Sequence, residues 1–162
     1  MSGSAASDAA LSVEPGWIKV VESGEGKFTE HLLDGRHRLL ADEPVAAGGN
    51  DRGPGPYELL LMALGACTTM TLRLYADRKR WPLERVSVKL RHAKIYAQDC
   101  ADCETKQGKL DRIERMIGLE GVLDPAQRQR LLEIADMCPV RRTLTSEIKI
   151  ETSLMAERDI SP

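Results

Sequence analysis

A long segment without charged residues, from Leu59 to Leu72, is the feature that most constrains how this chain can fold. Pro56 suits the first turn of a helix, where its missing N–H breaks no hydrogen bond, and charged residues become frequent only toward Arg80. The pattern predicts a helix from residue 56 to about residue 80, with its first turns apolar on nearly every side. Because one sheet covers only one face of a helix, we expect a second subunit or a second hydrophobic helix to enclose the rest.

The chain has 162 residues and a mass of 17.9 kDa, which suffices for one hydrophobic core. We expect a single domain over residues 16–154, with tails at 1–15 and 155–162. The 23 basic and 25 acidic residues give a net charge of −2, so the chain has no excess positive charge that would attract nucleic acid, and we expect no nucleic-acid partner. The start lacks the pattern of a secretion signal, and the uncharged run is shorter than the roughly 18 residues of a membrane span. We therefore expect a cytoplasmic protein without a membrane partner.

Short segments with strand character flank the predicted helix on both sides. Before it, turn signals at residues 23–26 and 34–35 indicate an antiparallel meander, and a Gly- and Pro-rich stretch over 42–56 indicates a long exposed loop without a regular element. After it, we expect a strand over 83–97, a polar loop over 98–111, a partner strand over 112–121, a helix over 124–138 with Asp124 as N-cap, and a last strand over 142–152. This order predicts an α+β fold with antiparallel sheets.

Four cysteines, at positions 67, 100, 103 and 138, are the candidate reactive groups. Cys67 and Cys138 fall on predicted helices that carry apolar residues, so both should point inward. A buried free cysteine is common, and each of the two could simply pack as a small hydrophobic residue. If the two helices pack with these faces together, however, one thiolate could be oxidised and the other could close a disulfide on it. The sequence leaves both interpretations open.

Cys100 and Cys103 form a C-x-x-C motif in the polar loop, among acidic residues such as Asp102 and Glu104. A zinc site needs four ligands, and the nearest imidazole, that of His92, lies eight residues upstream. The acidic neighbours raise a thiol pKa, which argues against a thioredoxin-like role. We interpret the motif as two exposed thiols that form an incidental disulfide, with a metal site as the weaker alternative.

Three stretches, taken in order, resemble a known family. They are "DEPVAAGG" in the loop, "GPYELLLMALGACTTMTLRLYA" in the first helix and "LLEIADMCPVRRTL" in the second. Together they resemble the OsmC/Ohr family of thiol-dependent hydroperoxide reductases, and most closely its OsmC-like branch. The resemblance covers residues 17–152 and rests on a helix with "GAC" followed by a helix with "CPV". It implies an intertwined homodimer, in which two central helices per subunit are enclosed by curved antiparallel sheets.

The resemblance also implies a function and two site residues. Family members reduce organic hydroperoxides, and in some cases hydrogen peroxide, in defence against oxidative stress, at two sites on the dimer interface. Cys67 would be the peroxidatic thiol and Cys138 the resolving thiol, with an external dithiol as reductant and no cofactor. The alternative is a non-catalytic protein on the same scaffold that binds a small apolar ligand or a metal.

Because an apolar pocket raises a thiol pKa, a cation is expected near the reactive thiol. The better-known branches place a glutamate directly after the helix-opening proline, whereas here Tyr57 follows Pro56 and Glu58 comes one residue later. Nine residues of helix turn about 900°, which puts Glu58 and Cys67 on opposite faces about 13 Å apart along the axis. Glu58 can therefore act on Cys67 only if the helix breaks or the partner subunit supplies it. The candidate arginines are Arg36, Arg38, Arg52 and Arg141.

Overall fold

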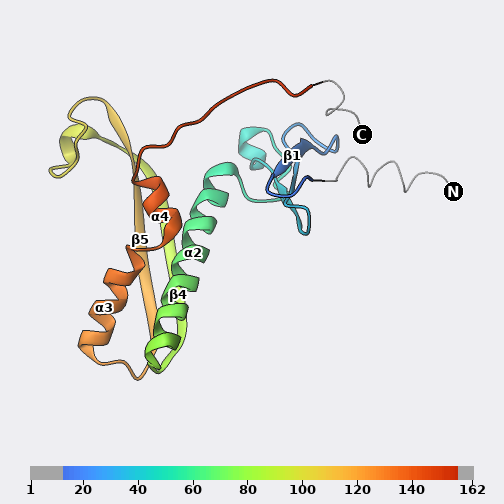
Figure 1. Ribbon diagram of the computed structural model, residues 1–162. Helices are drawn as coiled ribbons and strands as arrows, with labels where there is room; N and C mark the ends of the chain where they lie inside the picture. The colour runs from blue at the N-terminus through green and yellow to red at the C-terminus, as the bar shows by residue number, and fades with distance from the viewer. Residues whose placement is uncertain (1–12, 157–162) are drawn as a thin grey trace. The chain divides into compact units, whose positions relative to one another are not determined.

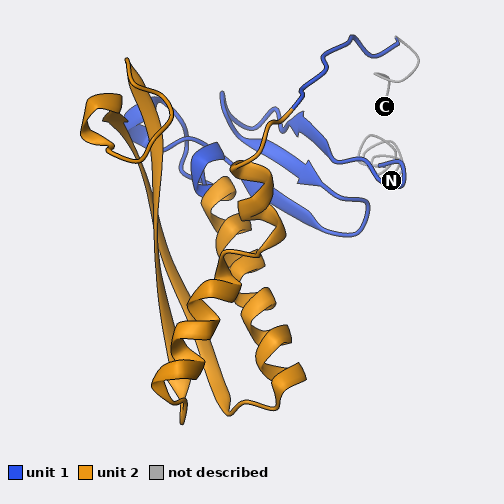
Figure 2. Ribbon diagram, turned by 60° about the vertical axis from the view of Figure 1, so that its left-hand side comes forward, with its two compact units in different colours: residues 1–58, 149–162 blue, residues 59–148 orange. Residues whose placement is uncertain are grey.

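The computed structural model describes residues 13–156, which form two compact units (Figure 1). One unit contains the described residues up to Glu58 and those from Lys149 onward, and the other is Leu59–Ile148 (Figure 2). Residues 1–12 and 157–162, which make up most of the two expected tails, lie outside the described residues. The single domain over 16–154 stays a prediction.

The first unit contains the predicted antiparallel meander. Its strands are β1 (Lys19–Glu22), β2 (Glu30–Leu33) and β3 (Arg38–Ala41), in the order β1-β2-β3. The turn between β2 and β3 is fixed by Asp34, whose carboxylate accepts the main-chain N–H groups of Arg36 at 2.8 Å and His37 at 2.6 Å. This is the side-chain turn that an Asp-Gly pair predicts.

The Gly- and Pro-rich stretch after β3 is organised around one carboxylate. It contains a 3-10 helix, η1 (Val45–Ala47), so the prediction that it holds no regular element is wrong for these three residues. Asp42 is only 2% exposed. Its carboxylate accepts hydrogen bonds from the Thr29 hydroxyl and from the main-chain N–H groups of Glu43, Asn50 and Arg52. Burial acts to raise the pKa of Asp42, but these hydrogen bonds outweigh it and hold the pKa below its ordinary value.

Helix α2 (Pro56–Lys79) begins at the proline and ends within a residue of the predicted end. Unit 2 continues with a long hairpin of β4 (Leu83–Tyr96) and β5 (Lys109–Gly121), whose connection contains the 3-10 helix η2 (Ala97–Asp99). Two further helices follow, α3 (Pro125–Ala135) and α4 (Pro139–Leu144). Figure 1 shows α2, the hairpin and α3 running alongside one another. The observed elements form an α+β fold with two antiparallel sheets, as predicted.

The core of unit 2 joins α2, β4 and α3. Its buried members are Leu72, Ala76, Leu83, Leu123, Leu131, Ile134 and Ala135. The start of α3 is fixed by a capping box, in which the Asp124 carboxylate accepts the Gln127 main-chain N–H and the Gln127 side chain accepts the Asp124 N–H. The predicted N-cap is confirmed. These contacts hold one face of α2 against the hairpin and α3.

Two predictions for the C-terminal part are wrong. The helix expected over 124–138 ends at Ala135, and Pro139 opens a separate helix. The residue before a proline disfavours the helical conformation, and Cys138 accordingly has φ −55° and ψ 128°. The strand expected over 142–152 does not form. Its first residues belong to α4, and the residues after them have no strand structure. Alternation indicates which side chains share a face, but a strand also needs a neighbour to pair with.

Within one chain, α2 is not covered on every side as the sequence predicts. Met62 is 58% exposed, Met70 70% and Leu74 52%. With the exposed Ala66 they lie four residues apart along one side of the helix, and we call these four residues the open face of α2. By length and composition α2 could also cross a membrane, a test that the core helix of a soluble protein passes equally well.

Candidate active site

Two free thiols meet in unit 2. Cys67 lies in the middle of α2 and is partly exposed, whereas Cys138 directly precedes α4 and is fully buried. The two thiols lie close enough together for each to shift the pKa of the other. The structure thus brings together the pair of cysteines that the sequence left as either separate packing residues or partners. Proximity of the two sulfurs is the first condition for a disulfide between them.

The break between α3 and α4 explains how Cys138 reaches this position. Pro139 forces Cys138 out of the helical conformation, and the first turn of α4 then has main-chain N–H groups without helical partners. The N–H of Val140 donates to the sulfur of Cys67, and the N–H of Arg141 donates to the sulfur of Cys138. The "CPV" motif therefore supplies both the second thiol and hydrogen-bond donors for the pair.

The two thiols differ in acidity. Burial raises the pKa of the Cys67 thiol, and the hydrogen bond shared with Cys138 raises it further. Burial acts in the same direction on Cys138, but hydrogen bonds from the Arg141 N–H, the Cys67 thiol and the Thr68 hydroxyl outweigh it and lower the Cys138 pKa below its ordinary value.

An arginine that the sequence argument did not select lies beside this pair. The side chain of Arg115, in β5, is only 14% exposed. Its Nη1 donates to the Thr68 hydroxyl and to the Ala135 carbonyl, both at 3.1 Å. Its Nη2 forms an ion pair with Asp136 at 2.7 Å. The Thr68 hydroxyl itself donates to the Leu64 carbonyl at 2.8 Å, and its proximity to Cys138 acts to lower the pKa of that thiol.

A signal for Arg115 is present in the sequence. In "RIERMIGLE", Arg115 occupies the same alternating position as Ile113 and Ile117, on the less exposed side of β5. A charged residue at an inward position of a half-buried strand is uncommon unless it is paired. A cation that acts on the reactive thiol stays a prediction, and Arg115 was not among its four candidates.

The structure places one of the four candidate arginines near the cysteines. Arg141 lies in unit 2, where its Nε is 3.1 Å from the Asp136 carboxylate and its Nη1 donates to the Asp136 carbonyl. Arg36, Arg38 and Arg52 belong to the other unit. There Arg38 contacts His31, and Arg52 forms an ion pair with Glu25.

Glu58 has a local role at the start of α2. Its carboxylate accepts the main-chain N–H of Gly55 at 2.8 Å, which satisfies a donor just before the helix. Helix α2 is unbroken from Pro56 to Lys79, so a break that would bring Glu58 to its own Cys67 does not occur. Contact with Cys67 would then require the partner subunit.

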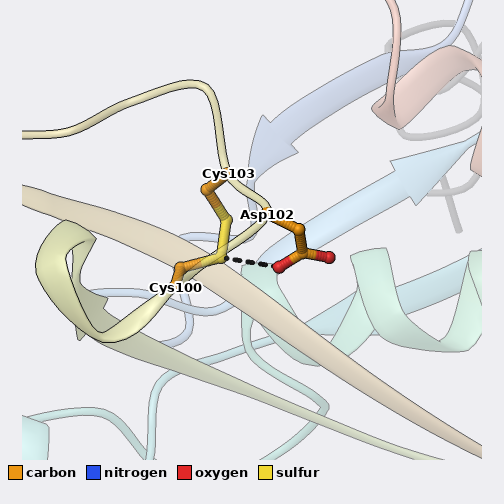
Figure 3. Close-up of side chains that lie close together, drawn as sticks. All are labelled: Cys100, Asp102 and Cys103. Atoms are coloured by element: carbon orange, nitrogen blue, oxygen red, sulfur yellow. Dashed lines mark hydrogen bonds between the residues drawn. A yellow bond between two sulfur atoms is a disulfide. The ribbon is translucent and has the colours of Figure 1, made fainter.

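The C-x-x-C motif lies between the two strands of the hairpin and forms a disulfide (Figure 3). The Cα atoms of Cys100 and Cys103 are 5.4 Å apart, and a carboxylate oxygen of Asp102 lies 3.5 Å from the Cys100 sulfur. In the described part of the chain these three residues are the one group of potential metal ligands that lie together, within 4.8 Å. Sulfurs joined in a disulfide are not thiolate ligands, so a metal here would require reduction first. The structure thus agrees with the disulfide interpretation.

Comparison with known proteins identifies the family. The sequence model described as OsmC-like protein matches residues 48–153, which is more than half of the chain. None of the curated protein sequences compared with the chain matches it significantly.

Solved structures show the same fold at low identity. An OsmC-like protein from Mycoplasma pneumoniae is 17% identical, with a TM-score of 0.61, over 79% of this chain and 85% of that chain. An organic hydroperoxide resistance protein, OsmC, from Legionella pneumophila is 21% identical, with a TM-score of 0.56, over 80% and 88%. The organic hydroperoxide resistance protein OhrB of Bacillus subtilis is 19% identical, with a TM-score of 0.53, over 80% and 90%. The resemblance seen in the sequence is confirmed, and this chain belongs to the OsmC family.

Proposed function

We propose that this protein reduces organic hydroperoxides with the thiols of Cys67 and Cys138, as part of the defence against oxidative stress. The observation that carries the proposal is the contact between two free thiols, one in α2 and one directly before α4. Membership of the OsmC family supports it, as does the fold shared with proteins named for organic hydroperoxide resistance.

Their difference in exposure supports different roles for the two thiols. Cys67 is partly exposed and Cys138 is fully buried, so the Cys67 sulfur is the one that a substrate can approach. The Cys67 thiolate attacks a peroxide oxygen, the O–O bond breaks, the alcohol leaves, and Cys67 becomes a sulfenic acid. The Cys138 thiolate then attacks the sulfenic sulfur and expels hydroxide. The resulting disulfide protects Cys67 from irreversible oxidation.

An external dithiol completes the cycle. One of its thiolates attacks the Cys67–Cys138 disulfide, and its second thiol resolves the mixed disulfide, so that two electrons and two protons return to the protein pair. This sequence needs no cofactor. A reducing compartment such as the cytoplasm supplies dithiols of this kind, and we place the protein there.

We further propose that the active form is a homodimer. The open face of α2 carries two methionines and a leucine, each more than half exposed in the single chain. A second copy of the chain would cover these apolar side chains and provide the enclosure that the uncharged segment predicts. The dimer would also bound the approach to Cys67, which lies on the same helix.

The experiment is intact-mass measurement after addition of one equivalent of cumene hydroperoxide to reduced protein. The parent is the Cys100→Ser/Cys103→Ser variant, so that the second dithiol cannot contribute. The expected result is a loss of two hydrogens. Adding Cys138→Ser should give instead the gain of one oxygen, trapped by dimedone at Cys67, and adding Cys67→Ser should abolish both changes. A parent that keeps its mass and its two thiols would refute the proposal and favour a protein that only binds a small apolar ligand.

A further inference from the structure

The proposed reaction leaves the C-x-x-C motif without a role. The motif lies in the connection between β4 and β5, residues 97–108, which we call the hairpin tip. Cys100 and Cys103 are both partly exposed, and they form a disulfide. A partly exposed disulfide is open to exchange with dithiols. In the reducing compartment in which we place the protein, the two residues would therefore exist as thiols.

Reduction converts the two cysteines into metal ligands. A thiolate of an external dithiol attacks one sulfur of the Cys100–Cys103 disulfide, and the second thiol of the reductant resolves the mixed disulfide. The reductant leaves as a disulfide, and the motif gains two electrons and two protons. A divalent cation can then replace the two protons, because metals bind thiolates rather than thiols.

The spacing of the two cysteines suits a zinc ion. Zinc sites commonly use two cysteines separated by two residues. Zn–S bonds of about 2.3 Å in a tetrahedral arrangement place two sulfurs about 3.8 Å apart, compared with about 2 Å in a disulfide. The Cα atoms of Cys100 and Cys103 are 5.4 Å apart. At this separation, rotation of the two side chains brings the sulfurs to the zinc-binding distance without a change in the main chain.

Asp102 offers a third ligand between the two cysteines. One of its carboxylate oxygens lies 3.5 Å from the Cys100 sulfur, and Figure 3 shows the carboxylate directed toward that sulfur. A tetrahedral zinc ion holds a sulfur and a carboxylate oxygen about 3.5 Å apart. All three ligand atoms lie within 4.8 Å of one another. Soft thiolate ligands favour zinc over magnesium or calcium, which prefer oxygen ligands.

We propose that the reduced hairpin tip is a zinc site formed by Cys100, Asp102 and Cys103, and that formation of the Cys100–Cys103 disulfide releases the ion. A water molecule would complete the tetrahedron. The disulfide form of the external dithiol reverses the reduction, because it takes back the two electrons and leaves no thiolate ligand. The inference goes beyond the proposed function and does not depend on it, since neither Cys67 nor Cys138 takes part.

The charges of the hairpin tip favour a cation. Residues 97–108 carry three carboxylates, those of Asp99, Asp102 and Glu104, and one ammonium group, that of Lys106. Their net negative charge attracts a divalent ion. Zinc with two thiolates and one carboxylate keeps a charge of −1. Lys106 can offset this charge, because its ammonium group donates to the Cys103 carbonyl at 2.6 Å.

The Cys67–Cys138 pair is the internal comparison for this site. Cys138 is fully buried, and among the described residues the pair belongs to no group of three potential metal ligands. A zinc ion there would have two protein ligands instead of three. Zinc should therefore bind to the exposed dithiol and not to the pair that we propose to reduce peroxides.

The experiment is a zinc titration of the full chain, freed of metal and kept reduced with a phosphine, in competition with a chromophoric chelator. The expected result is one bound ion per chain. Cys67→Ser/Cys138→Ser should bind zinc like the parent, lose it when the remaining dithiol is oxidised, and regain it on reduction. Cys100→Ser/Cys103→Ser should bind none. Titration with Co²⁺ should give a thiolate-to-metal charge-transfer absorption in the same variants that bind zinc.

Two matched variants test the carboxylate. Asp102→Asn should weaken zinc binding about tenfold or more, since even a partner outside the ligand shell contributes that much. Asp99→Asn is the control, because it removes the same charge directly before Cys100 but from outside the ligand group. It should change zinc binding little. Cys103→His replaces one zinc ligand by another and should retain binding, whereas Cys103→Ser should lose it.

A reduced chain that binds no zinc would overturn the proposal, and so would equal binding by the parent and by Cys100→Ser/Cys103→Ser. Equal weakening by Asp102→Asn and Asp99→Asn would show that Asp102 acts through its charge alone and is not a ligand. All of these measurements are made without peroxide. Zinc binding in a chain that fails to reduce cumene hydroperoxide would thus overturn the proposed function and leave the zinc site standing.

Discussion

Cys67, in the middle of α2, and Cys138, directly before α4, lie close enough together for each thiol to shift the pKa of the other. The two sulfurs therefore titrate as a pair. Once one of them is ionised, its charge opposes ionisation of the other.

The pH dependence of peroxide reduction follows from this pairing. Since the Cys67 thiolate is the proposed nucleophile and the pKa of Cys67 is raised, the rate of Cys67 oxidation should increase through an ionisation above that of an ordinary thiol, about 8.5. Quenched-flow alkylation at a series of pH values measures it. In Cys138→Ser, where the charge that raises the Cys67 pKa is lost, oxidation of Cys67 should begin at lower pH. A parent rate that levels off below about pH 8 would contradict the raised pKa of Cys67.

The open face of α2 predicts a dimer that one charge can disrupt. Met70→Glu places a carboxylate at the most exposed apolar position of this face, where burial against a second copy would leave it unpaired. Sedimentation velocity should show a dimer for the parent and a monomer for the variant. Met116→Glu is the control, because Met116 is equally exposed, at 71%, but lies in β5. An unchanged mass for Met70→Glu would place the subunit contact elsewhere.

Two adjacent leucines of α3 should differ strongly in their contribution to stability. Leu131 is 0% exposed in the core of unit 2, and Leu132 is 45% exposed. Leu131→Ala should lower the free energy of unfolding by about 2–5 kcal/mol, because it removes buried methyl groups and leaves a cavity. Leu132→Ala should cost about 1 kcal/mol or less. Urea unfolding measures both, and equal losses would mean that the core assignment of α3 is wrong.

Asp42 should make the stability of the first unit depend on pH. Its pKa is lower in the folded chain than in the unfolded chain, so its contribution is fully present above about pH 4 and is lost as the pH falls through the folded pKa. Asp42→Asn should therefore be less stable than the parent at neutral pH, and the two proteins should converge in acid. Thermal unfolding at a series of pH values compares them. Parallel curves at all pH values would show that the carboxylate charge is unimportant.

Local chemistry made most elements predictable from the sequence. Pro56 located the start of α2, the Asp124 cap located the start of α3, and the Asp34-Gly35 turn located the meander. Each is a signal that a few neighbouring residues fully specify. The last predicted strand failed because alternation says nothing about whether an edge is available for pairing.

The candidate site was predictable only in part, for a related reason. Cys67 and Cys138 could be paired because each lies in a recognisable motif. Arg115 could not be chosen, since its contact with Thr68 depends on which strand faces α2 and how far a long side chain reaches. Arg141 was among the candidates, but its backbone, rather than its guanidinium, donates to the thiol pair.

The open face of α2 also makes the single chain sensitive to oxidative damage. Met62 and Met70 present thioethers on the helix that carries Cys67, and peroxides convert thioethers to polar sulfoxides. In the proposed dimer a second copy covers these side chains, so a chain that meets a peroxide before it pairs would acquire polar oxygens on the open face. Unpaired chains would then be damaged and paired chains spared, which makes newly synthesised protein the more sensitive to the peroxides that we propose it reduces.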